Sequence, residues 1–536
     1  MSDQQQGRPV TREHASAAVD GRPPAVPAAL VGVAAGAATL GVAELGAGAA
    51  VRLLDATGTP SPLLAVAGAF VDRTPAWLKD WAVATFGTAD KIALGVGMGI
   101  TLLLVSAAVG LLGRLSRALA VAVFLVVGAL ALGAVLSRPD AMPADLWPTL
   151  AGLAVGTAVL VVGLGRLRRE EVAVDGPVAG RRGVLLAAGG VGVLGVLGVV
   201  AGQALTRTGR AAGAAARALG LPVPVRRVEV PAGATASVEG QTPFITPTED
   251  FYRIDTALWV PRVDPATWTL RVTGLVEREV EIDWAELLEQ EHVEAIVTLT
   301  CVSNAVGGPL VGNTVWTGWP VRELLARAGV RPEADMVLSR SADGWTAGTP
   351  IEAMTDDRDS LIAVAMDGEP LPPEHGFPVR LVVPGLYGYV SATKWVTELK
   401  VTRFDADEGY WTPRGWAELG PIKTASRIDV PRSEARVRAG EVPVAGVAWA
   451  QQRGISAVEV RVDDGPWQQA ELAAQPSEDA WRLWSWTWPD ASPGRHQLTV
   501  RATDGTGETQ TERPAAPAPD GASGWHSVEV TVAEAG

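Results

Sequence analysis

Five long apolar stretches before residue 206 constrain this chain more than any other feature of its sequence. They run approximately over Val26–Val51, Ile92–Gly113, Ala118–Leu136, Leu146–Gly165 and Gly183–Thr206. Each is long enough to cross about 30 Å of hydrocarbon as a helix, and their Gly and Ala content favours close helix packing in lipid. A shorter run, Pro62–Val71, cannot cross and predicts an interfacial or re-entrant segment. Residues 26–206 are therefore predicted to form an α-helical transmembrane bundle.

Positive charges set the expected orientation of this bundle. Arginines gather before the first stretch, between the second and third, and between the fourth and fifth: Arg8, Arg12, Arg22, Arg114, Arg117, Arg166, Arg168, Arg169, Arg181 and Arg182. By the positive-inside rule, these ends face the cytoplasm, with residues 1–25 as a cytoplasmic tail. Five crossings then place everything after residue 206 outside a multi-pass cytoplasmic membrane protein. The Arg181-Arg182 pair also resembles a twin-arginine export signal, and an ordinary positive flank would explain the pair alone equally well. Its position directly before the last span, which the second half of the chain follows, favours the export signal.

Glu44 lies inside the first apolar stretch, and carboxylates in membrane spans are often functional. A transport or sensor role for the bundle is one interpretation of this residue. The other is a protonated or helix-paired side chain near the outer end of the span, which the lack of a second titratable partner in the spans favours.

Cysteine, histidine and net charge limit the chemistry. The chain has one cysteine, which excludes a disulfide framework and any Cys-rich zinc or iron–sulfur site. No span contains a histidine and no CxxCH motif occurs, so no haem is expected. A formal charge of −14 argues against a nucleic-acid partner.

The second half of the chain has the mixed composition of soluble domains. Residues 207–242 are rich in Ala, Arg and Pro and predict a linker. Residues 243–404 alternate strand-like runs such as Ala295–Leu299 with helix-like runs such as Val321–Ala328, which predicts an α+β (mixed) domain. After a connector at 405–425, residues 426–536 show short strands separated by turns, typical of an immunoglobulin-like β-sandwich.

Cys301 follows an extended apolar run and begins a polar turn, Cys301–Asn304. Ligands and catalytic groups commonly lie at strand ends of this kind, and a thiolate there could bind a soft metal. A lone cysteine is also commonly a small buried apolar residue, and both interpretations stand on this evidence.

Five segments in the same order resemble the sulfite oxidase family of molybdopterin enzymes. They are the entry segment Phe251–Asp255, the cysteine turn Thr300–Asn304, the His-Gly-x-Pro-x-Arg segment Glu374–Gly385, the lysine segment Tyr387–Trp395 and Ile422–Ile428 at the start of a dimerisation domain. The resemblance covers about residues 242–532.

The resemblance implies a molybdenum–molybdopterin cofactor with Cys301 as metal ligand and catalytic residue. Its other expected site residues fall into two groups. The expected catalytic residues besides Cys301 are Arg253 and Trp345, which stands where the family has a tyrosine. The expected cofactor contacts are Arg253, Asn304, His375, Arg380, Ser391 and Lys394. As alternatives, Arg380 and Lys394 are surface ion pairs and His375 is a loop residue.

Departures from the family bear on the substrate. Sulfite oxidases have an arginine where Val306 stands, and another before their Lys-Trp pair, where this chain has Val390, Ser391 and Ala392. Losing these charged partners weakens the case for sulfite and favours a less charged oxide such as a sulfoxide or an N-oxide.

The sequence therefore predicts two-electron oxo transfer on a small-molecule substrate. Electrons would pass to or from a separate carrier or the quinone pool, and the C-terminal domain would pair two chains into a homodimer. The alternatives are a sulfite oxidase proper and a cofactor-free surface binding module on the same fold.

Overall fold

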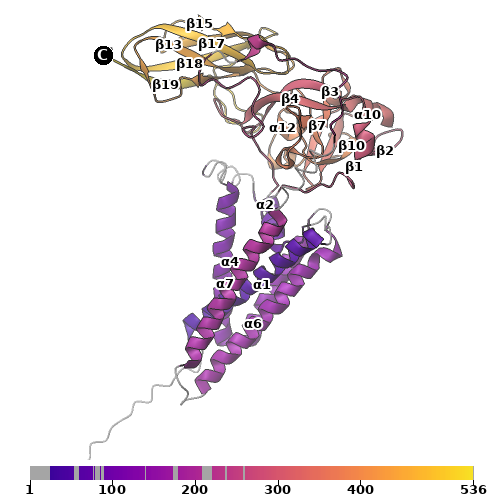
Figure 1. The fold of residues 1–536 in the computed structure, drawn as a ribbon, viewed down its shortest axis with the longest axis vertical. Helices are drawn as coiled ribbons and strands as arrows, with labels where there is room; N and C mark the ends of the chain where they lie inside the picture. Colours follow the sequence, from indigo (N-terminus) through magenta and orange to yellow (C-terminus); the bar gives the residue numbers. More distant parts are fainter. Residues whose placement is uncertain are drawn as a thin grey trace, which may run out of the picture. The chain divides into compact units, whose positions relative to one another are not determined.

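The computed structural model describes residues 24–53, 59–75, 78, 85, 90–138, 141–172, 179–207, 220–235, 238–257 and 260–534. Most of the expected cytoplasmic tail and part of the expected linker lie outside these residues, as do the side chains of Arg181 and Arg182. The chain divides into two compact units, one made of the N-terminal helices and the other mainly of the residues from 220 onward (Figure 1).

Among the described residues, five helices are long and apolar enough to cross a membrane, as the sequence predicts. They are α1 (Ala25–Leu53), α4 (Asp90–Leu115), α5 (Arg117–Leu136), α6 (Trp147–Val172) and α7 (Ala179–Arg207). Helix α1 packs against α4, α6 and α7 and is the central helix of the bundle (Figure 1). A Cβ atom on Gly198 would lie only 2.9 Å from the Cα of Gly41, so glycine allows α1 and α7 to approach this closely.

The short apolar run forms helix α2 (Pro62–Arg73), which polar contacts hold at both ends. The buried Glu44 carboxylate accepts hydrogen bonds from Ser61 Oγ at 2.7 Å and from the Leu63 N–H at 3.3 Å. At the other end, Asp72 forms an ion pair with Arg138 at 2.5 Å. Of the two interpretations of Glu44, this geometry matches the helix-paired one: the carboxylate binds otherwise unpaired donors at the start of α2.

Two sheets form the first part of the second unit. One has the strand order β3-β4-β7-β8, with β9 also paired to β7, and all its pairs are antiparallel. The other has the order β2-β1-β10-β5-β6, in which β1 and β10 run parallel. The strands are β1 (Thr269–Gly274), β2 (Val280–Asp283), β3 (Val293–Thr300), β4 (Val311–Pro320), β5 (Met336–Ser341), β6 (Thr346–Pro350), β7 (Leu361–Met366), β8 (Glu369–Pro370), β9 (Arg380–Val382) and β10 (Val396–Thr402). This is the mixed architecture that the sequence predicts.

Short helices accompany these sheets: α9 (Trp284–Leu288), α10 (Val321–Ala328), α11 (Glu352–Thr355) and α12 (Gly388–Ser391). Helix α10 has the bounds expected from the sequence. Its buried residues are apolar and recur at helical spacing: Val321, Leu324, Leu325 and Ala328. It ends at Gly329, whose φ of 73° is the left-handed conformation that favours glycine.

The remaining strands form two further sheets, with orders β11-β13-β17-β16 and β12-β19-β18-β14-β15. Their bounds are β11 (Ala425–Val430), β12 (Ala435–Arg438), β13 (Gly440–Trp449), β14 (Ile455–Val462), β15 (Gln468–Gln469), β16 (Glu471–Leu472), β17 (Arg482–Ala491), β18 (Gly494–Asp504) and β19 (His526–Ala533). One apolar core lies within this two-sheet domain. Trp449 and Trp481 instead belong to the core that includes β1 and β10, so the two-sheet domain shares a core with the preceding sheets.

Candidate functional site

Cys301 directly follows β3 and opens a loop that returns to β4. Its N–H donates to the Leu310 carbonyl at 3.0 Å, and its carbonyl accepts from the Asn304 N–H at 3.0 Å. Asn304 Oδ1 then accepts from the Leu310 N–H at 2.8 Å, which closes the loop. Burial raises the pKa of the Cys301 thiol, while hydrogen bonds from Ser303 act in the opposite direction. The side chain of Asn304 therefore maintains the cysteine turn.

Arg380, on β9, has a buried guanidinium that forms no ion pair with a described carboxylate. The residue is only 5% exposed, and no described carboxylate lies within ion-pair distance of it. Its Nη1 donates to the His375 carbonyl at 3.1 Å, and its guanidinium lies 4.9 Å from the centre of the Trp316 ring. Burial lowers its pKa to about 10. Because an uncompensated buried cation is destabilising, this arrangement favours binding of an anion.

Lys394 lies beside Arg380, across an isolated antiparallel bridge. Its Nζ contacts Asp255 Oδ2 at 2.6 Å and the Glu374 carbonyl at 3.2 Å. Asp255 also accepts from Arg253 Nε at 2.8 Å, so one carboxylate is shared by two cations. Burial lowers the pKa of Lys394 to about 8, although Asp255 opposes that shift. The site therefore holds three cations and one carboxylate.

His375 is buried against the same group of cations. Its ring packs edge-on against Phe251, with the ring centres 5.8 Å apart. Burial, followed by the charges of Arg380 and Lys394, lowers its pKa to about 4. The imidazole is therefore neutral at pH 7 and can both donate and accept a hydrogen bond.

Tyr252 joins the thiol to this cationic group. Burial and the neighbouring Cys301 raise the pKa of its hydroxyl, while Arg380 acts in the opposite direction. The hydroxyl is therefore close enough to Cys301 and Arg380 for both to affect its pKa. The sequence places Tyr252 in the entry segment, next to Arg253, but nothing in the pattern singles it out as a site residue. Asp255, two residues further on, was missed in the same way.

Two expected site residues make their hydrogen bonds elsewhere. The Ser391 hydroxyl donates within its own segment, to the carbonyls of Leu386 and Tyr387. Trp345 lies in the turn between β5 and β6, where its N–H bonds Asp343 at 3.1 Å. In the described part of the chain, Trp345 makes no hydrogen bond or ring contact with the other expected site residues.

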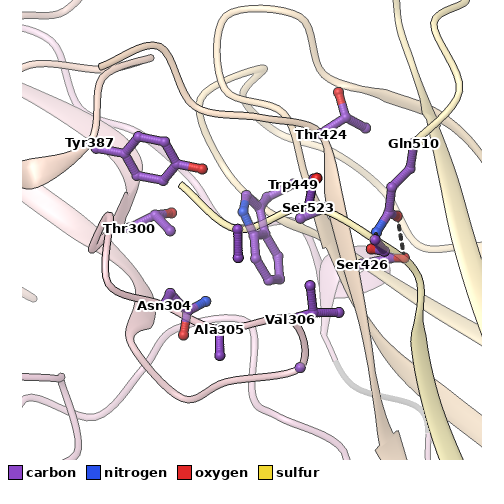
Figure 2. A pocket seen from close by; sticks show the side chains of 14 residues that line it. Thr300, Asn304, Ala305, Val306, Tyr387, Thr424, Ser426, Trp449, Gln510 and Ser523 are labelled. Atoms are coloured by element: carbon purple, nitrogen blue, oxygen red, sulfur yellow. Dashed lines mark hydrogen bonds between the residues drawn. The ribbon is translucent and has the colours of Figure 1, made fainter. Parts of the chain in front are cut away.

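A cavity lies beside the cysteine turn, with walls from both parts of the second unit (Figure 2). Its volume is about 20 Å³, room for about one water molecule, and Cys301 is not among the residues that line it. The lining residues from the cysteine turn and the lysine segment include Thr300, Asn304, Val306 and Tyr387. Those from the C-terminal part of the chain include Thr424, Ser426, Trp449, Gln510 and Ser523. Every side chain in the lining is uncharged. The sequence pattern does not indicate the C-terminal part of the lining, because its residues come together only through folding.

Comparisons with known proteins point to one kind of protein domain. Residues 257–411 match the family described as oxidoreductase molybdopterin binding domain. The chain is 31% identical over 290 residues to mitochondrial sulfite oxidase of Mus musculus, covering 45% of this chain and 52% of that protein. It is 28% identical to sulfite oxidase of Gallus gallus, over 50% of this chain and 68% of that protein. It is 34% identical to nitrate reductase [NADH] 1 of Oryza sativa subsp. japonica, over 31% of this chain and 21% of that protein.

The chain spans about half the length of the first of these relatives. Among solved structures, it is similar to the sulfane dehydrogenase SoxCD from Paracoccus pantotrophus, with 24% identity and a TM-score of 0.47. That likeness covers 60% of this chain and 94% of the other.

Inorganic phosphate should bind this group of cations less tightly as the pH rises through about 8, the pKa of Lys394. Near pH 8 phosphate is already mostly dianionic, so a fall in its affinity reports the loss of the positive charge on Lys394. We expect about a tenfold loss of affinity, the usual effect of one charge-assisted hydrogen bond. Phosphorus NMR titration of the full chain would measure it. Lys394→Arg stays charged throughout this range, so the same loss in that variant would contradict the assignment to Lys394.

Proposed function

Because residues 257–411 form a molybdopterin-binding oxidoreductase domain of the sulfite oxidase type, we propose that this chain transfers an oxo group at a molybdenum centre bound by Cys301. The observation that carries the proposal is the buried guanidinium of Arg380 beside Tyr252 and the Cys301 thiol. Such a cation needs an anionic partner, and a thiol at a strand end suits a soft metal.

The residues present fit a molybdopterin cofactor. Arg380 lacks a carboxylate, and the Asp255 carboxylate already lies between two cations, where the anionic part of a bound group could take its place. On this proposal, His375, Arg380, Lys394 and Arg253 hold the pterin and its phosphate. Asn304 acts through the cysteine turn and Ser391 through its backbone segment. The bound group supplies the two-electron oxo-transfer chemistry, and the protein positions it and controls access.

Three side chains have defined protonation roles in this proposal. Metal binding would remove the proton from Cys301, overcoming the effect of burial on its pKa. Tyr252 keeps its proton on Oη, because burial raises its pKa, so its hydroxyl would be available to donate a hydrogen bond to a bound substrate. His375 stays neutral, because its pKa is about 4. Arg253 and Trp345 remain proposed catalytic residues, Trp345 for a substrate that extends to the turn between β5 and β6.

The residues near the cysteine turn support a small uncharged substrate, such as a sulfoxide or an N-oxide. Val306 stands where sulfite oxidases have an arginine, and the side chains that line the small cavity beside it are all uncharged. A sulfite dianion would lack that guanidinium as a partner. Sulfite oxidation is the second candidate function, and the identity to sulfite oxidases favours it.

The same proposal extends to the rest of the chain. The five apolar helices and the positive-inside pattern support a multi-pass protein of the cytoplasmic membrane, with the catalytic part on the outer side. Electrons would pass through a separate carrier or a quinone. The two-sheet domain would be an immunoglobulin-like unit, with a boundary near residue 426, that pairs two chains.

A cofactor-free binding module is the remaining alternative. In such a module the buried Arg380 would have no counter-charge, which lowers the stability of the folded protein unless an anion binds. The unpaired guanidinium therefore favours a cofactor-binding protein over such a module.

Molybdenum content of the full chain, made in cells supplied with molybdate, would test the proposal. We expect near-stoichiometric metal in the parent and at least a tenfold loss in Arg380→Gln, which removes the charge that binds the cofactor. Cys301→Ser should fold and lose turnover. Arg271→Gln, at an exposed position on β1, is the matched control and should keep its metal. A folded parent chain without molybdenum would leave the binding-module alternative.

Introducing an arginine at Val306 would test the substrate class. Val306 is 37% exposed, so a longer side chain has room there. Val306→Arg should raise the rate of sulfite oxidation, relative to reduction of an uncharged oxide, by about tenfold, because it adds one charge-assisted contact. Val306→Gln adds length without charge and should leave this ratio near the parent value. A parent that already prefers sulfite would favour the sulfite oxidase alternative instead.

A further inference from the structure

The strand that leads to Cys301 is held at its free edge by the two-sheet domain. β3 is an edge strand of its sheet. The Thr298 N–H donates to the Asp479 carbonyl at 2.9 Å, and Gln451 Nε2 donates to the Thr298 carbonyl at 2.9 Å. The Trp481 N–H donates to the Thr298 hydroxyl at 2.7 Å. The backbone three residues before Cys301 is therefore fixed from outside its own sheet.

The loop after Cys301 contacts the same domain through Gly308. Within the loop, the Gly308 N–H donates to the Ala305 carbonyl at 2.8 Å. The Gly308 carbonyl accepts instead from Nη1 of Arg427, on β11, at 2.9 Å. This hydrogen bond joins the cysteine loop to the first strand of the two-sheet domain.

Arg427 is itself held rigidly. Its Nε donates to Asp429 Oδ1 at 2.7 Å, and its Nη2 donates to the Thr242 hydroxyl at 3.0 Å. Asp429 Oδ2 in turn accepts from the Thr242 N–H at 3.2 Å. The side chains of Arg427 and Asp429 are 12% and 9% exposed. Since all three guanidinium nitrogens are engaged, the donor to Gly308 is preorganised and little side-chain entropy is lost in using it.

His526, at the start of β19, packs against the neighbouring Gly307. A Cβ atom on Gly307 would lie 2.1 Å from Cδ2 of the imidazole, and the φ of Gly307 is 75°. His526 Nδ1 accepts from the Ile428 N–H at 3.0 Å, so the ring is fixed on β11. Together, β11 and β19 form a fitted surface for Gly307 and Gly308.

We propose that Arg427 is a positioning residue for Cys301: by holding the Gly308 carbonyl, it fixes the loop that sets the direction of the thiol. This inference rests on the function proposed for Cys301, and it gives the two-sheet domain a role in the reaction besides chain pairing. Arg427 acts through the backbone and touches neither substrate nor cofactor. Its loss should therefore lower kcat, and alter the electron paramagnetic resonance signal of the metal, with KM little changed.

The lone cysteine gives a direct test that does not depend on the metal. In the cofactor-free full chain in detergent, Cys301 is the one thiol that iodoacetamide can alkylate. Arg427→Gln should raise the alkylation rate about tenfold, the effect of losing one charge-assisted hydrogen bond. Arg427→Lys keeps the charge beside Asp429 but cannot also reach Gly308, so it should fold normally and show a faster rate as well. Arg438→Gln, at an exposed position on β12, is the matched control.

Unchanged alkylation in both Arg427 variants would overturn the proposal. So would faster alkylation with the kcat and the resonance signal of the loaded enzyme unchanged, since the contact would then be structural only. If no chain ever binds molybdenum but alkylation rises as expected, the proposed function fails, while the coupling between Arg427 and the Cys301 loop stands.

Discussion

The site depends on a buried cation without its own counter-charge. Arg380 lies on a core strand, and its guanidinium has carbonyl and aromatic neighbours but no carboxylate among the described residues. Nearby, Lys394 and Arg253 share Asp255, and the imidazole of His375 is kept neutral. An arrangement of this kind is unfavourable in an empty protein and favourable around an anion.

A second constraint acts on the thiol. Cys301 directly follows an edge strand, and an edge strand leaves backbone N–H and C=O groups unpaired unless something covers them. Here the covering segments come from the two-sheet domain, through Asp479 and Gln451 on the strand and Arg427 on the loop. A shared apolar core, with Trp449 and Trp481, also joins the two parts. The small cavity beside the cysteine turn has lining residues from both parts.

The sequence predicted what depends on local pattern. The five spans, helix α10 and the strand before Cys301 follow from hydrophobic length and periodicity. What it missed are pairs far apart in the chain: Lys394 and Asp255 are 139 residues apart, and Tyr252 approaches Cys301 only in the fold. The Glu44 contact with Ser61 is of the same kind, because neither residue reveals its partner. Periodicity encodes which face is buried, and it does not encode which polar groups meet there.

X-ray absorption at the molybdenum edge tests the account most directly, because it counts the sulfur atoms bound to the metal. For the full chain purified from cells supplied with molybdate, we predict one sulfur ligand fewer in Cys301→Ser than in the parent, at equal metal content. The same sulfur count in both proteins would contradict the account, since the thiol at the end of β3 would then not bind the metal.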